Sequence, residues 1–146
     1  MIYAGFLRRA FAFFIDIFLI IGIYILFFAT LIFHLPALLL LLSGQKDFYF
    51  VKMILLYIVG TLPFLYIIYF TFFHGFNGSS PGKALFKIKL VTISGEEIGY
   101  LKALIRSLAS FISALSLFAG YFAMFFDERK RTWHDRIAKT MAVVKE

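Results

Sequence analysis

The sequence contains no cysteine, three prolines and one tryptophan, and its 146 residues include only eight Asp and Glu side chains. The absence of cysteine excludes disulfides, thiol catalysis and cysteine-ligated metals. Charged residues make up 16% of the chain, whereas soluble domains carry roughly a quarter. Hydrophobic residues reach 62% and aromatic residues 21%. Because polar surface is so scarce, most apolar surface must face lipid, and the sequence predicts an integral membrane protein.

The positive charge of the chain does not indicate nucleic-acid binding. The net charge is +7, from 15 Lys and Arg residues. These residues cluster beside hydrophobic segments rather than along one stripe with aromatic platforms. Basic residues that flank spans set membrane topology and attract anionic headgroups. We therefore expect the lipid bilayer and its anionic headgroups as partners, and no nucleic acid.

Three apolar segments organise the chain into a single membrane domain, residues 1–146. Residues 6–33 and 48–73 are each long enough to form a transmembrane helix. Pro36 is expected to end or break the first of them. The third segment covers residues 107–126. We expect an all-α membrane protein in the cell (inner) membrane, multi-pass, with a cytoplasmic N-terminus.

The third apolar segment has two possible arrangements. About twenty residues suffice for one span. However, Lys102 and Arg106 precede it and a strongly basic segment, residues 129–139, follows it. A full crossing would put that basic segment outside, against the positive-inside tendency. A re-entrant hairpin would keep both of its ends in the cytoplasm, and this alternative is favoured over a third span.

A soluble-type loop separates the second and third apolar segments. Residues 77–82 form a turn cluster, and residues 85–91 alternate apolar and basic side chains in their middle. This pattern predicts a short amphipathic strand or hairpin on the cytoplasmic membrane surface. The lysines of this loop are expected to contact lipid phosphates: Lys83, Lys87 and Lys89.

Asp16 is the only formal charge between Arg9 and Lys46. An ionised carboxylate in hydrocarbon costs several kcal/mol, so such residues are paired, wetted or functional. Arg9 lies seven residues upstream, on the same helix face and roughly 10 Å away along the axis. The spacing suits two positions on one polar pathway, and Asp16 is the candidate ion site.

Three motifs carry a family resemblance: Arg9 with Asp16, the turn Gly78–Lys83, and the C-terminal segment Asp127–Thr140. In these motifs the chain resembles the RDD family of small membrane proteins, named for one arginine and two aspartates. The resemblance implies that the triad is Arg9, Asp16 and Asp135. Pro81 departs from the aliphatic residue usual before Gly-Lys, which affects the turn. Some members are reported as monovalent cation/proton antiporters, so the resemblance implies transport.

The triad supports two functional classes. In a transporter of monovalent cations and protons, or of a small solute, Asp16 would bind Na⁺ or a proton, and Arg9 with Asp135 would form a cytoplasmic gate. Such a small protein would act as a homo-oligomer, because few helices enclose little pathway. Alternatively, the three residues form a structural ion-pair network. The protein would then be a non-transporting scaffold, assembly factor or lipid-binding module.

Enzyme motifs are incomplete. Residues 78–83 are one residue short of a phosphate-binding loop, and Ala84 replaces its Ser or Thr. His134 and Asp135 lack the serine elbow of a hydrolase. The histidines are not expected to converge on a metal. We expect no enzyme activity and no cofactor or metal.

Overall fold

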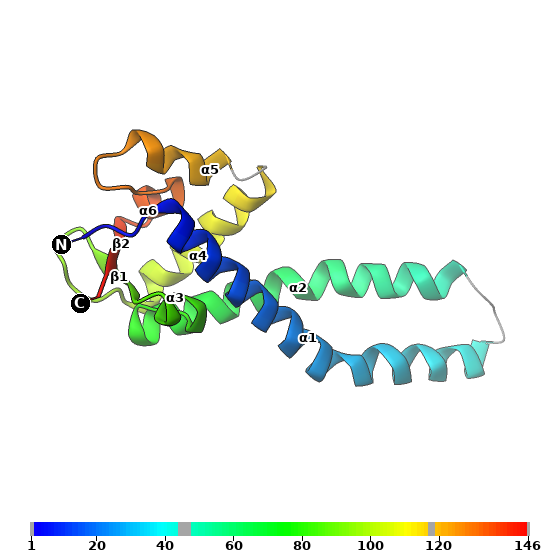
Figure 1. Cartoon of the computed structure of the whole chain (residues 1–146). Coiled ribbons are helices and arrows are strands. Elements are labelled where there is room, and N and C mark those ends of the chain that lie inside the picture. Colours follow the sequence, from blue (N-terminus) through cyan, green and yellow to red (C-terminus); the bar gives the residue numbers. More distant parts are fainter. Residues whose placement is uncertain (1, 44–47, 117–118, 146) are drawn as a thin grey trace.

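The computed structural model describes the backbone of residues 2–43, 48–116 and 119–145. It also describes the side chains of these residues, except those of residues 27–51, 53–54 and 119. Two long helices dominate: α1 (Phe6–Ser43) and α2 (Phe48–Asn77). Figure 1 shows them running together away from a compact end that holds both termini. Their stretches Phe6–Leu26 and Leu55–Asn77 are long and apolar enough to cross a membrane. The two predicted spans are therefore confirmed as helices.

The expectation that Pro36 ends or breaks the first helix is wrong, because α1 continues through that position to Ser43. A proline removes one backbone hydrogen bond. Leaving the leucine-rich residues 38–42 outside the helix would expose several backbone groups to lipid. In α2, which likewise continues through Pro63, the Thr61 hydroxyl donates to the Tyr57 carbonyl at 2.7 Å.

The third apolar segment forms α4 (Tyr100–Leu115), followed by α5 (Ala119–Phe122) and a 3₁₀ turn, η1 (Ala123–Phe126). The helix thus begins seven residues before the predicted start at 107. The axes of Tyr100–Leu115 and Gly120–Phe126 differ by 116°. The segment is therefore bent rather than a single straight span. α4 packs along α2 and buries small and polar side chains there.

A two-stranded antiparallel sheet closes the compact end. It pairs β1 (Ile88–Thr92) with β2 (Thr140–Val144). A strand is present close to the predicted residues 85–91, but it covers Ile88–Thr92 and is mostly buried rather than amphipathic. Its main partner, however, is the C-terminal strand and not a neighbouring hairpin strand, although one bridge joins Val91 to Glu97. Two short helices precede the strands: α3 (Pro81–Leu85) before β1 and α6 (Trp133–Ile137) before β2.

The sheet brings three distant parts of the chain together at one end of the molecule. β2 pairs with β1, and Tyr3 bridges Val143 on the far edge of β2. The N-terminus, the loop after α2 and the C-terminal strand therefore meet at one end (Figure 1). One full crossing by residues 107–126 would separate β2 from β1. The pairing favours the re-entrant alternative, which stays a prediction because the bent segment fits either a broken span or a re-entrant loop.

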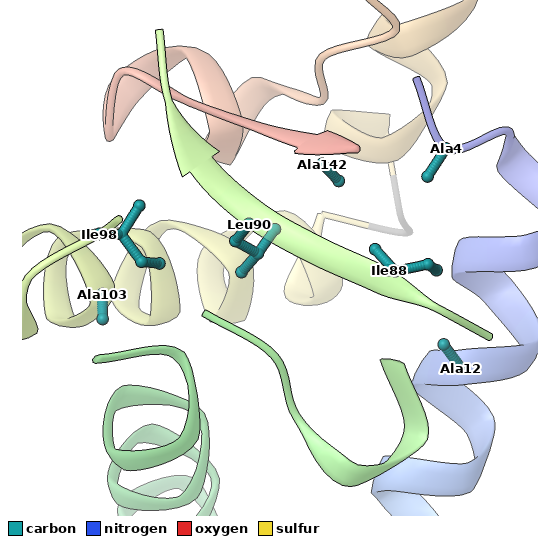
Figure 2. Close-up of a cluster of buried hydrophobic side chains, with 7 residues drawn as sticks. All are labelled: Ala4, Ala12, Ile88, Leu90, Ile98, Ala103 and Ala142. Atoms are coloured by element: carbon teal, nitrogen blue, oxygen red, sulfur yellow. The ribbon is translucent and has the colours of Figure 1, made fainter. Parts of the chain in front are cut away.

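A small apolar core holds the compact end together. Figure 2 shows Ile88 and Leu90 of β1 among alanines and one isoleucine from the surrounding elements. The alanines allow close backbone approach, since they add little bulk. The cluster fixes the start of α1 against the sheet and α4, and it comprises Ala4, Ala12, Ile88, Leu90, Ile98, Ala103 and Ala142.

Candidate functional site

Asp16 lies fully buried in α1, where three donors surround its carboxylate. The Tyr69 hydroxyl of α2 donates to Oδ1 at 3.0 Å, and the Ser80 hydroxyl donates to Oδ2. The backbone N–H of Gly82 donates to Oδ1 at 2.8 Å. Hydrogen bonds to the ionised form stabilise a buried carboxylate. Asp16 therefore joins α1 to α2 and to the start of α3 through neutral donors.

Gly82 allows α3 to approach α1 closely enough for that bond. A Cβ at this position would lie 2.2 Å from the Ala12 carbonyl oxygen and 2.9 Å from Asp16 Cγ. Both contacts are shorter than non-bonded atoms tolerate, so the position requires glycine. The turn residues that sequence analysis recognised as a motif thus serve to bring a backbone N–H to Asp16.

Asp135 is the second fully buried carboxylate, and two arginines share it. Arg9 Nη1 lies 2.6 Å from Oδ2, and Arg106 Nη2 and Nε lie 2.8 and 2.9 Å from Oδ1. Asp135 also caps α6, because it accepts the Thr132 backbone N–H at 3.2 Å. Burial raises the pKa of Asp135, but Arg106 and Arg9 hold that pKa well below its usual value. The group is ionised at neutral pH.

Arg9 links distant parts of the chain beyond its ion pair. Its Nε donates to the Ala4 carbonyl at 3.0 Å, and its Nη2 donates to the Lys130 carbonyl at 2.7 Å. A longer bond of 3.5 Å reaches the carbonyl of Ala142 in β2. The planar guanidinium suits such divergent contacts. Arg9 therefore fixes the N-terminal stretch and the C-terminal segment around the start of α1.

A cavity of about 30 Å³ lies beside Arg9 and Arg106 and is lined mainly by buried side chains. Lys83 reaches into this region, and its Nζ lies 2.7 Å from His74 Nε2 and 5.1 Å from the centre of the Phe70 ring. Burial and the nearby Arg106 lower the pKa of Lys83 well below its usual value. The lining residues are Arg9, Phe13, Tyr66, Phe70, His74, Lys83, Arg106, Ser107, Ser110, Tyr121, Thr132 and His134.

His134 belongs to the same polar cluster but is uncharged. Its Nε2 lies 2.8 Å from the Thr132 hydroxyl, and its ring packs edge-on against Tyr121. Burial lowers the pKa of His134 to about 3, although Asp135 opposes that shift. Its 3.9 Å approach to Asp135 is therefore no ion pair at neutral pH.

The structure pairs Arg9 with Asp135. Asp16 pairs with neither of them: among the described residues, its partners are neutral donors from α2 and the α3 region. The expectation that Lys83 contacts lipid phosphates is wrong, because its side chain is buried against His74. Lys89 pairs with Glu97 at 2.7 Å, and Lys87 is exposed. Their contacts with phosphate stay predictions.

The sequence motifs did not identify Arg106 and Tyr69 as site residues, and they included Ser80 and Gly82 only as members of the turn, without a role for either. Arg106 was identified only as a flanking charge, although it is the last base before the third apolar segment. That position, directly before an apolar run, was the available signal. Tyr69 is one of several tyrosines in α2, and its register with Asp16 has no local signature.

Within the described ranges, no group of three or more His, Asp or Glu side chains could hold a metal ion. The chain is 35% identical to the proline-rich antigen homolog of Mycobacterium tuberculosis over 86 residues, which are 58% of this chain and 35% of the relative. It is 31% identical to the proline-rich antigen of Mycobacterium leprae over 70 residues, which are 47% and 28% respectively.

The chain thus spans about a third of the length of these curated relatives. No solved structure matches it. A sequence profile of the RDD family matches residues 3–139. That match includes Arg9, Asp16 and Asp135, the three residues around which the buried polar groups are arranged. The chain belongs to the RDD family of membrane proteins.

Proposed function

We propose that this protein is a non-transporting membrane module, a scaffold or assembly factor with no enzymatic activity. The hydrogen bonding of Asp16 carries the proposal. A transport carboxylate must exchange its partners for an ion and face water, whereas a structural carboxylate keeps fixed partners. Asp16 accepts three hydrogen bonds from three chain positions and does not line the polar cavity.

The two carboxylates together cross-link the compact end. Asp16 holds α1 to α2 and α3, and Asp135 holds α1 to α4 and α6. Removing one partner of a buried ion pair is strongly destabilising, so such links maintain one arrangement of helices. In the mycobacterial relatives the matched region is about a third of the chain. That proportion fits a membrane unit joined to other sequence.

The proposal includes an orientation in the cell membrane. Exposed basic side chains gather in the segments of the compact end, among them Arg8, Lys87, Lys102 and Lys130. The positive-inside tendency favours a cytoplasmic location for this end, where anionic headgroups attract it. A fluorescent reporter fused after Glu146 tests this: we expect cytoplasmic fluorescence, and periplasmic enzyme activity from a matched phosphatase fusion would contradict it.

Cation/proton antiport is the second candidate. The polar cavity favours it, because Lys83 and His74 are ionisable groups that line a space close to Asp16. This alternative needs Asp16 to leave its three donors during each cycle. It also needs self-association into a homo-oligomer, since α1 and α2 alone enclose little pathway.

Reconstituted protein distinguishes the two candidates. Liposomes containing a pH-sensitive dye are exposed to Na⁺, K⁺ or Li⁺ gradients, with the wild type and Asp16→Asn in parallel. The module predicts dye responses equal to those of protein-free vesicles for both proteins, and lower thermal stability for the variant. A cation-driven proton flux in the wild type that Asp16→Asn abolishes, while the variant stays folded, would replace the module with an antiporter.

A further inference from the structure

An apolar groove lies between the first turns of α1 and the segment formed by α5 and η1. Its volume is about 380 Å³, and its walls are almost entirely apolar. On α1 the lining residues follow the spacing i, i+3, i+4, i+7 and i+8, so one face of the helix runs along the groove. The lining residues are Phe6, Arg9, Ala10, Phe13 and Phe14 of α1, with Tyr121, Phe122 and Met124 opposite.

Aromatic contacts join the two walls of the groove. The rings of Phe6 and Phe122 stack with their centres 6.2 Å apart, and those of Phe13 and Tyr121 lie 6.0 Å apart. Ala10 lies between Phe6 and Phe13 on the same face of α1, and its methyl group fills little space. The hollow therefore lies beside Ala10.

The groove lies at the depth of the membrane hydrocarbon. Its α1 wall belongs to Phe6–Leu26, the stretch of α1 that is long and apolar enough to cross a membrane. From Phe6 to Phe14 the helix axis covers about 12 Å, whereas one leaflet contributes about 15 Å of hydrocarbon. Water finds too few hydrogen-bond partners in an apolar space. An acyl chain of a neighbouring lipid matches the groove in depth and in chemistry.

Cationic side chains gather at the end of the groove where α1 begins. Arg8 is exposed on the first turn of α1. The Lys130 carbonyl accepts a hydrogen bond from Arg9 Nη2 at 2.7 Å, so the turn that follows η1 lies beside the start of α1. This turn exposes Arg129 and Lys130 together with one carboxylate, Glu128. A lipid whose chain lies in the groove would place its phosphate near these side chains.

We propose that the groove binds one anionic phospholipid, with an acyl chain against Ala10 and the headgroup phosphate beside Arg8, Arg129 and Lys130. The basic side chains outnumber the single carboxylate of Glu128, which favours an anionic over a zwitterionic headgroup. A second copy of this chain fits less well, because it would bring like charges together at the same end. The bound lipid links α5 and η1 to α1, whether the protein is a membrane module or an antiporter.

Native mass spectrometry of the full chain tests the site. The protein is reconstituted in vesicles of equal parts phosphatidylcholine and phosphatidylglycerol with the same acyl chains, and is then extracted in a mild detergent. We expect one phosphatidylglycerol per chain at detergent concentrations that remove phosphatidylcholine. Equal retention of the two lipids, or retention of neither, would overturn the proposal. A lipid-free dimer would also overturn it, because a second chain would then fill the groove.

A pair of variants assigns the retained lipid to the groove. Ala10→Phe fills the hollow and should lose the phosphatidylglycerol. Ile21→Phe places the same ring on the exposed surface of α1 outside the groove, and should keep it. Retention at the wild-type level in folded Ala10→Phe would contradict the site.

A surface variant tests the headgroup contacts without altering the apolar walls. Arg8→Gln combined with Arg129→Gln should weaken the retention of phosphatidylglycerol by about fivefold for each charge removed. Lys102→Gln removes an exposed charge of α4, which does not line the groove, and should leave retention unchanged. Equal retention in the double variant and in Lys102→Gln would show that the phosphate does not lie beside these arginines.

Discussion

The backbone N–H of Gly82 lies 2.8 Å from Asp16 Oδ1, at a position where any side chain would collide with α1. This contact gives a carboxylate inside an apolar helix a fixed backbone partner in α3, 66 residues away in the sequence. It requires both the missing Cβ of Gly82 and the carboxylate of Asp16. The two residues therefore act together to dock α3 against the membrane-spanning helix.

Gly82→Ala should lower the free energy of unfolding by about 1–3 kcal/mol, the usual cost of overpacking. The added methyl would meet the Ala12 carbonyl oxygen at 2.2 Å, and α3 would have to move away from Asp16. Thermal or denaturant unfolding in micelles measures the loss. Gly60→Ala is the control, because nothing lies within 4 Å of a Cβ there. Equal stability of the two variants would contradict the close approach.

The sequence predicted the membrane class and both long helices, because apolar length is a local property. It also indicated the importance of Asp16, Gly82 and Asp135 through their motifs. It could not show which partners they have. Tyr69 and Ser80 reach Asp16 across 53 and 64 positions, and helix register decides such contacts. β2 was missed for the same reason, since its partner strand is remote in sequence.

Tyr69→Phe should lower the free energy of unfolding by about 1.5–3 kcal/mol, as expected for a hydrogen bond to a charged group. The ring remains to pack against Phe70 and Phe73, so the change isolates the hydroxyl. Tyr100→Phe is the matched control, since the Tyr100 side chain is half exposed. A loss no greater than that of the control would show that Asp16 does not depend on Tyr69.

Arg106→Met should lower the free energy of unfolding by about 3–5 kcal/mol, because it breaks a buried ion pair. Lys102→Met lies one turn earlier on α4, at an exposed position, and should change stability little. Chemical denaturation in micelles compares them. Similar midpoints for Arg106→Met and the wild type would contradict the assignment of Arg106 to the shared carboxylate.

The pH dependence of stability should report His134. Burial lowers the pKa of His134 from 6.5 to about 3. Between these two pH values, His134 binds a proton in the unfolded chain but stays neutral in the folded chain. The contribution of neutral His134 is therefore complete above pH 6.5 and declines as the pH falls toward 3. The carboxyl of Asp135 has a pKa held well below 3.8, so its contribution declines only at lower pH.

His134→Gln should flatten the decline of the unfolding midpoint between pH 6.5 and pH 4, because glutamine does not titrate. The wild type and the variant share every other titratable or charged group around the ring, so a difference between their curves reports His134 alone. These shared groups are Arg9, His74, Lys83, Arg106 and Asp135. Parallel curves for the variant and the wild type would show that His134 is accessible to protons in the folded state.

Hydrogen exchange at the Gly82 amide tests the central claim most directly, because that amide donates to Asp16. The protein labelled with ¹⁵N-glycine is followed in micelles at low and high Na⁺ and across neutral pH, with Asp16→Asn as the reference for a weakened contact. A structural Asp16 predicts strong protection of Gly82 that Na⁺ and pH do not change. Protection that falls when Na⁺ is added would mean that Asp16 releases its partner for an ion, and would contradict the account.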